Sequence, residues 1–241
     1  MADVPATTCA CTRIHIGEAS RPPDVAALRA FVDRVAPHVD RVAIAVGAPG
    51  IEGTTERLRQ LSDLVARCQA ATQGAATPVD VIPVDPWGAF TPALNALAAH
   101  ASKAGCGRAL FASVETTFSS ETVAALREQL LRHDALVVGA ALPGHDFQAG
   151  RRPLGGRTAP WNTLALWRLD RLCLVGFPLV ADGVHAGVCR QCPFPIRRLL
   201  DGVTLSPLSP CAPDSLLNYP AGRRGRRGGR HDSSGARPRS E

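Results

Sequence analysis

Short apolar runs alternate with longer amphipathic segments along most of this chain. The runs are rich in Val, Ile and Leu and have the length of β-strands, whereas the segments between them repeat apolar residues at helical spacing. Strands are expected at 14–16, 42–46, 79–84, 108–112, 136–140 and 160–168. This alternation predicts an α/β fold, with a mainly parallel sheet, right-handed crossovers and helices on both faces.

Helix starts and helix faces follow from capping residues and from apolar periodicity. The residues expected to begin the first four helices are Pro22 with Pro23, Thr54 or Thr55, Thr91, and Ser119 or Ser120. The side chains expected to face the sheet are Val25, Leu28, Val32 and Val35, then Leu58, Leu61, Val65 and Cys68, then Leu94, Leu97 and Ala101, then Val123, Leu126 and Leu130. A short fifth helix is expected at 169–175.

Length and composition are those of one globular domain. The 241 residues are 45% hydrophobic, which is enough to build a core in a single α/β domain. No apolar run approaches the roughly 18 residues of a transmembrane helix, and the N-terminal sequence MADVPATTCACTR lacks the layout of a signal peptide. These features predict a soluble, cytoplasmic protein without a membrane span.

The formal net charge of +6 is concentrated at one end of the chain. Residues 221–241 contain seven arginines and only two acidic residues, so the rest of the chain is nearly neutral. Periodicity fails from Gly187 onward, which predicts a folded domain at 12–183 and an irregular, largely disordered tail at 184–241. The RRGRRGGR run in this tail has the charge to bind nucleic-acid phosphates, but no aromatic residue is interleaved for base stacking. A solvated basic tail, or a C-terminus replaced by altered splicing or a frame change, explains the same pattern.

Eight cysteines are spread along the chain. Cys68, Cys106 and Cys173 fall within helix or strand patterns and are expected to be small core residues. Two closely spaced pairs remain, Cys9 with Cys11 and Cys189 with Cys192. They are either four thiolate ligands for one zinc ion or unpaired thiols, and no disulfide framework is implied.

The segment 79–115 carries the most specific pattern in the chain. An apolar strand (VDVIPV) is followed by a turn (DPWG), a helix containing Ala93-Leu94-Asn95, and a strand (RALFA) that ends on Ser113-Val114-Glu115. Further on, a strand and a short helix lead to a Gly176-Phe177 turn. This order resembles nucleotide-diphospho-sugar transferases of the GT-A type, such as those of glycosyltransferase family 2. The resemblance implies a single Rossmann-like GT-A domain that transfers a sugar from a nucleotide-diphosphate sugar to an acceptor, which the sequence does not identify.

A diphosphate leaving group needs positive charge, either from Mn²⁺ or Mg²⁺ held on carboxylates or from Arg and Lys. GT-A enzymes usually carry an Asp-x-Asp where this chain has Ser113-Val114-Glu115. The resemblance therefore makes Ser113 a donor-site residue and Glu115 the single metal ligand, supplemented by phosphates and water. The alternative is that Glu115 is a solvent-facing residue at a strand end.

The loop after the first strand meets the nucleotide in the resembled family. Here it contains Glu18, Ser20 and Arg21, of which Arg21 can pair with a phosphate and Ser20 can donate a hydrogen bond to it. Ser20 is equally explained as a helix cap. The turn after the second strand, Gly47-Ala48-Pro49-Gly50, lacks the acidic residue that many relatives use to contact the base.

Three further donor-site residues are predicted from the segment 85–95. Asp85 and Trp87 flank the end of the third strand, where Trp87 either stacks on a base or sugar or plugs the turn against the core. Asn95 matches the Ala-x-Asn position of the family, with a loop-bracing hydrogen bond as the alternative.

Transfer with inversion needs a general base, and Asp182 is the nearest acidic candidate after the Gly-Phe turn, with His185 as a second choice. Three other enzyme classes are not indicated. The chain has no Gly-x-Gly-x-x-Gly after a strand, as in dinucleotide oxidoreductases, no Walker A sequence, as in P-loop NTPases, and no Gly-x-Ser-x-Gly elbow, as in α/β-hydrolases. The rival hypotheses are a non-catalytic GT-A scaffold that binds a nucleotide sugar or a protein partner, and a nucleic-acid-binding protein that acts through its tail.

Overall fold

A computed structural model describes residues 7–16, 23–48, 54–88, 90–145 and 159–178, together with the backbone of 205–207. Several predicted residues lie outside these ranges: Glu18, Ser20, Arg21, Asp182, His185, Cys189 and Cys192. The arginine-rich segment 221–241 lies outside them as well.

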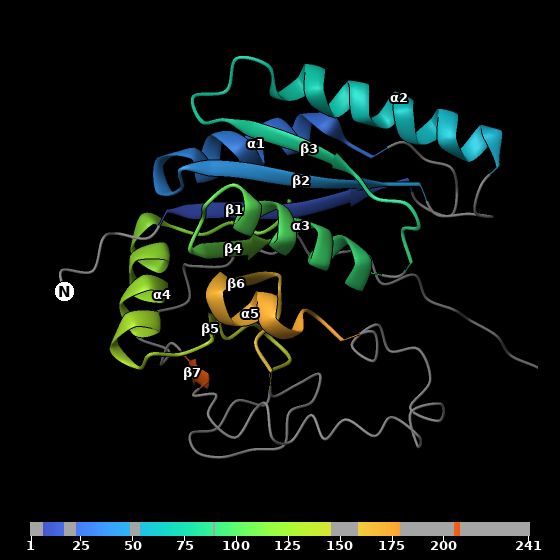
Figure 1. Cartoon of the computed structure of the whole chain (residues 1–241). Helices are drawn as coiled ribbons and strands as arrows, with labels where there is room; N and C mark the ends of the chain where they lie inside the picture. The colour runs from blue at the N-terminus through green and yellow to red at the C-terminus, as the bar shows by residue number, and fades with distance from the viewer. Residues whose placement is uncertain are drawn as a thin grey trace, which may run out of the picture.

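The described chain forms a seven-stranded sheet in the order β3-β2-β1-β4-β6-β5-β7 (Figure 1). The strands are β1 (Thr8–His15), β2 (Arg41–Gly47), β3 (Val79–Pro83), β4 (Arg108–Ala112), β5 (Val137–Gly139), β6 (Leu164–Arg168) and β7 (Leu205–Pro207). Only β6 runs antiparallel to its neighbours β4 and β5, and the remaining neighbouring pairs are parallel. The predicted α/β class with a mainly parallel sheet is therefore confirmed.

Helices cover both faces of the sheet. The helices are α1 (Val25–Val35), α2 (Thr55–Thr72), α3 (Thr91–Lys103), α4 (Ser120–Arg132) and α5 (Leu169–Val175), with a 3-10 turn, η1 (Ala36–His38), after α1. One apolar cluster joins α1, α2 and α4 to one face, and a second joins α3 and α5 to the other face, which is turned toward the viewer in Figure 1. Side chains alternate between these clusters along each central strand, as the pleat of a strand requires.

The first strand is longer than the sequence prediction of 14–16. It begins at Thr8, and both Cys9 and Cys11 are buried within it, with their Sγ atoms 3.9 Å apart. A strand buried on both faces shows no polar alternation, and small residues replace the usual Val and Ile here, so periodicity could not detect it. The Cys-x-Cys pair is thus part of the core, and the described residues contain no group of three His, Cys, Asp or Glu side chains arranged for a metal ion.

Several helix predictions are also corrected. The first helix begins at Val25, with Asp24 as its N-cap, rather than at Pro22 with Pro23, and Cys173 of α5 is exposed rather than part of the core. Leu58 does not face the sheet, since it is 48% exposed, and the buried face of α2 begins instead at Arg57 and continues through Leu61 and Leu64. The N-cap of α3 is Phe90, while Thr91 is its first residue and is buried. The predicted caps Thr54 and Ser119 are confirmed, because each hydroxyl accepts a backbone N–H of the first helical turn.

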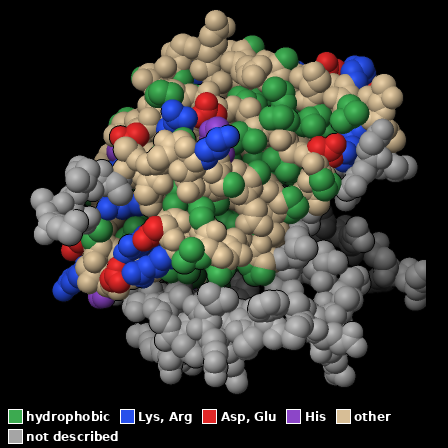
Figure 2. Space-filling view, viewed as in Figure 1, with side chains coloured by type: hydrophobic (Ala, Val, Ile, Leu, Met, Phe, Trp, Pro, Cys, Tyr) green, Lys and Arg blue, Asp and Glu red, His purple; other side chains and the backbone are tan. Residues whose placement is uncertain are grey.

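Charged side chains lie in mixed clusters of both signs on the face that carries α3 and α5 (Figure 2). This arrangement agrees with the nearly neutral sequence outside the tail. Within the part of the chain that the structure describes, no helix is both long enough and apolar enough to cross a membrane.

Candidate functional site

The order of the strands creates a topological switch point between β1 and β4. From β1 the chain adds β2 and β3 on one side, and it then crosses to place β4 on the other side. In open α/β sheets, ligands bind outside the carboxyl ends of the strands at such a point. The β1–β4 ladder ends at the pair Cys11 and Phe111, whereas β1 continues beside β2 as far as His15 and Gly47. Continuing the register of that ladder brings Arg13 level with Ser113.

The predicted Ser113-Val114-Glu115 tip forms a fastened turn at this edge. The Ser113 N–H donates to the carbonyl oxygen of Thr163 (3.1 Å), and the Thr116 N–H donates to the carbonyl oxygen of Ser113 (3.0 Å). Glu115 is exposed on this turn, and no ion pair joins it to another described residue. The Glu115 carboxylate is therefore exposed to solvent, on a turn whose backbone is held by hydrogen bonds at Ser113 and Thr116.

Arg34 of α1 also contacts the Ser113-Val114-Glu115 turn. Its Nη2 donates to the carbonyl oxygen of Val114 (2.9 Å), and its guanidinium carbon lies 5.7 Å from the centre of the Phe31 ring and 5.9 Å from that of Phe118. Partial burial lowers the pKa of Arg34 from its ordinary value, although the group stays charged at any physiological pH. Sequence patterns gave no signal for this contact because it joins residues 80 positions apart.

The residues at this tip do not fit a metal held by protein carboxylates. Asp-x-Asp supplies two carboxylates, whereas this turn supplies Glu115 alone, with the Ser113 hydroxyl in place of the other. The described residues contain no cluster of three metal-binding side chains that could add further ligands. Mg²⁺ can be bound through one or two carboxylates, but then substrate phosphates and water must supply the remaining ligands.

Asp85 is brought to the carboxyl edge by the turn after β3, but it pairs with a protein cation. Arg57, the third residue of α2, is buried at 6% exposure and forms an ion pair with the Asp85 carboxylate. This pair explains why Arg57 rather than Leu58 faces inward, since a buried guanidinium requires an acidic partner. Asp85, which is predicted to contact the donor, therefore also attaches its turn to α2 through this ion pair.

Trp87 is buried in the same turn, at 3% exposure. Its ring covers Gly47 at the end of β2, where a Cβ atom would lie only 1.8 Å from the Trp87 Cε3 atom. The ring also lies beside that of His15, with the ring centres 5.3 Å apart. The structure thus matches the alternative in which Trp87 plugs the turn against the core.

Asn95 joins the two segments that carried the family resemblance. Its Nδ2 donates to the carbonyl oxygen of Phe177 (3.0 Å), and its Oδ1 accepts the Phe177 N–H (2.7 Å). Gly176 has a φ of +67°, and a Cβ atom there would lie 2.9 Å from Asn95 Oδ1, so glycine suits this position on both counts. The side chain of Asn95 therefore braces the Gly-Phe turn.

Two residues at the switch point were missed by sequence reasoning. Arg13 and His15 are exposed and share one face of β1 at its carboxyl end. The Arg13 guanidinium carbon lies 5.1 Å from the centre of the Phe90 ring, and partial burial, followed by the charge of Arg13, lowers the pKa of His15. If the strand is predicted to begin at Thr8, the polar residues Arg13 and His15, two positions apart, indicate its carboxyl end.

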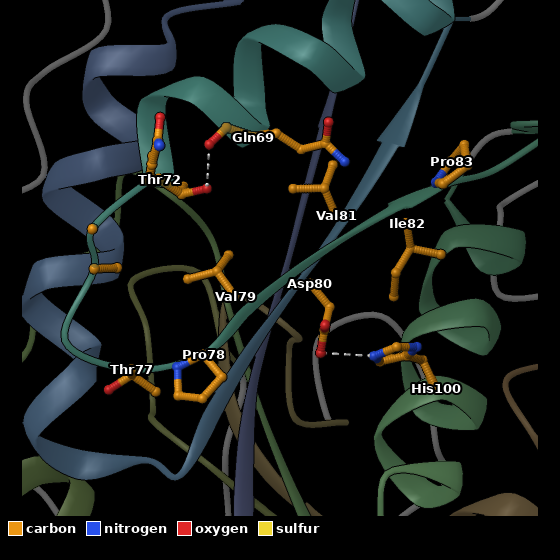
Figure 3. Close-up of a pocket in the computed structure, with 13 residues that line it drawn as sticks. Gln69, Thr72, Thr77, Pro78, Val79, Asp80, Val81, Ile82, Pro83 and His100 are labelled. Carbon is orange, nitrogen blue, oxygen red and sulfur yellow. Dashed lines mark hydrogen bonds and ion pairs between the residues drawn. The ribbon is translucent and has the colours of Figure 1, made fainter.

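A separate groove of about 600 Å³ follows the outer edge of β3 (Figure 3). It is lined by β3, by the end of α2 and by His100 of α3, and contains none of the predicted site residues. Asp80 lies in this groove and is shared between His100 and Arg41, at 3.0 Å from each. The groove therefore lies apart from the switch point, and its acidic group is already paired.

No protein family and no curated protein matches this sequence. Among solved structures, a crystal structure of S. aureus TarS 1–349 is similar, with a TM-score of 0.40 and 13% identity, over 71% of this chain and 50% of that chain. TarS 1–349 in complex with UDP gives a TM-score of 0.41 and 13% identity, over 75% and 52% of the two chains. The complex with UDP-GlcNAc gives 0.41 and 14%, over 71% and 48%. The chain thus spans about half the length of these TarS structures.

Proposed function

We propose that this protein binds a nucleotide-diphosphate sugar at the carboxyl ends of β1 and β4 and acts as a GT-A-type glycosyltransferase. One observation carries the proposal: the DPWG turn after β3 and the Ser113-Val114-Glu115 turn after β4 both lie at the carboxyl ends of the strands, where an open α/β sheet binds its ligands. The hydrogen bonds between Asn95 and Phe177 support it, because they link the two segments with the family pattern.

The residues divide into a framework and a set of candidate ligand contacts. Asn95, Trp87 and the ion pair of Asp85 with Arg57 hold the turns in place. Ser113 and Glu115 are the described candidates for contact with the donor or with a Mn²⁺ or Mg²⁺ ion bound to it. The proposed phosphate contacts Ser20 and Arg21, the proposed donor-site residue Glu18 and the proposed base Asp182 lie outside the described residues. A base at Asp182 would take the proton of the acceptor hydroxyl as the nucleoside diphosphate departs.

The proposal is tested by thermal denaturation with a panel of UDP-, GDP- and other nucleotide sugars, with and without Mn²⁺ or Mg²⁺. One donor at a hundredfold excess over its Kd is expected to raise the Tm by about 5 °C or more. Glu115→Ala is expected to reduce release of the nucleoside diphosphate while leaving the Tm of the free protein unchanged, because Glu115 is exposed. The matched control is Glu128→Ala, which removes an exposed glutamate of α4. Failure of every donor to shift the Tm would contradict the proposal.

A non-catalytic scaffold is the second candidate, favoured by the single carboxylate of the Ser113-Val114-Glu115 turn. It predicts a Tm shift with one donor but no release of nucleoside diphosphate, with or without added acceptors. Measuring both quantities on the same samples distinguishes the two functions.

A further inference from the structure

The switch point offers few carboxylates for a metal ion, whereas an arginine, Arg13, lies at the carboxyl end of β1. A metal-dependent diphosphate site needs acidic ligands, but Glu115 is the one carboxylate on the β4 turn, and Asp85 is engaged by Arg57. Positive charge for a diphosphate can instead come directly from arginine, whose guanidinium presents several donors to phosphate oxygens. Arg13 lies where such a group is needed.

The register of the strands defines the position of Arg13. The last described pair of the β1–β4 ladder is Cys11 with Phe111, so Arg13 is two residues farther along β1, level with Ser113. At this level β1 and β4 are no longer paired, because the Ser113 N–H donates to the carbonyl oxygen of Thr163 while β1 continues beside β2.

Contacts on the α3 side hold both polar side chains of β1 at this edge. The Arg13 guanidinium carbon is 5.1 Å from the centre of the Phe90 ring, in the range of a cation–π contact, and the residue is exposed. The His15 ring is 5.3 Å from the ring of Trp87, which is itself fixed over Gly47. A neutral imidazole still has one N–H to donate to a phosphate oxygen.

We infer that Arg13 binds the diphosphate of the nucleotide sugar directly, assisted by a hydrogen bond from His15, so that donor binding does not require a divalent cation. The inference rests on the proposed function and specifies how its donor site neutralises phosphate charge. The nearby ion pair of Arg57 with Asp85 is neutral overall and does not compete for the phosphate.

The experiment is isothermal titration calorimetry with UDP, GDP, CDP, ADP and inorganic pyrophosphate, first in EDTA and then in Mg²⁺ or Mn²⁺. One nucleoside diphosphate is expected to bind wild-type protein in EDTA, with a Kd within about threefold of its value in metal. Arg13→Gln is expected to weaken that binding by roughly tenfold to a hundredfold, the usual effect of losing a hydrogen bond to a charged group. His15→Gln is expected to have a smaller effect.

Two further variants provide controls. Arg132→Gln makes the same charge change at an exposed position at the end of α4 and is expected to leave the Kd unchanged. Arg13→Lys keeps the charge and is expected to recover part of the lost affinity, and it replaces Arg13→Gln if that variant fails to fold, as judged by circular dichroism.

The outcomes separate this inference from the function on which it rests. Binding that requires metal and Glu115, and that is insensitive to Arg13, would overturn the inference and leave the proposed function standing. Equal weakening by Arg132→Gln would also overturn it, because the effect would then be one of net charge. If no nucleotide binds under any condition, both proposals fail.

Discussion

The amino ends and the carboxyl ends of the parallel strands form two opposite sides of the molecule, here called the amino edge and the carboxyl edge. They contain similar polar residues, but these residues make different contacts. At the amino edge, charged groups neutralise one another near the surface: Arg168 pairs with Asp134 and with Asp170, and Arg171 also pairs with Asp134. Hydrogen bonding to Arg171 is the largest cause that holds the pKa of Asp134 below its ordinary value. The charges at this edge are satisfied within the protein.

At the carboxyl edge, the ion pair of Arg57 with Asp85 is accompanied by polar groups that contact backbone and aromatic rings. Asn95 is bonded to the backbone of Phe177, Arg34 to the carbonyl of Val114, and Arg13 lies against Phe90. These contacts fix the turns, while Arg13 and Glu115 remain exposed. Exposed ion pairs thus stabilise the amino edge, whereas the turns of the carboxyl edge are held mainly by contacts to backbone and rings and keep Arg13 and Glu115 at the surface.

Gly47→Ala, at the carboxyl edge, is expected to cause the largest loss of stability. The new Cβ atom would overlap the Trp87 ring, so the ring must leave its buried site, at a cost of about 3 kcal/mol in the free energy of unfolding. Urea denaturation followed by circular dichroism measures this loss. In a Trp87→Ala background the same substitution is expected to cost little, and additive costs would show that the two residues are not coupled.

Asn95→Ala is expected to have the next largest effect. It removes both side-chain hydrogen bonds to Phe177 and leaves two backbone groups without those partners, which costs about 2 kcal/mol. Hydrogen exchange at the Phe177 amide is expected to accelerate in the variant. Unchanged exchange and stability would mean that other contacts hold the Gly-Phe turn and that Asn95 does not stabilise it.

The smallest effect is expected at the amino edge. Arg168→Gln breaks ion pairs whose acidic partners are exposed, so the Tm is expected to fall by less than about 2 °C. The shift should shrink further in 1 M NaCl, since salt screens exposed charges. A loss as large as that of Gly47→Ala would remove the distinction between the two edges.

The sequence predicted most of the fold because its elements carry strong periodic or capping signals. The strand at 108–112 and the helix at 169–175 have the predicted bounds, and the caps Thr54 and Ser119 have their predicted role. The pattern of strands and helices does not specify that β6 inserts antiparallel between β4 and β5, since this depends on pairing between residues 52 to 60 positions apart.

The candidate site was predicted less well, because its contacts join segments that are distant in sequence. Asp85 and Trp87 were assigned to the correct edge, but their partners Arg57 and Gly47 come from another helix and another strand. Arg13 and His15 were missed because β1 is built from Cys, Ala and Thr, which do not produce the usual strand pattern. The assignments of Glu18, Ser20, Arg21 and Asp182 remain predictions.

The position of β6 has a consequence for biosynthesis. Because β6 lies between β4 and β5 but follows both in the chain, a nascent polypeptide that ends before Leu164 contains two strands whose edges have no partner. Unpaired edges promote association between chains. Ribosome stalling or proteolytic cleavage between β5 and β6 would therefore release an aggregation-prone fragment, whereas synthesis through Arg168 supplies the strand that pairs with both edges.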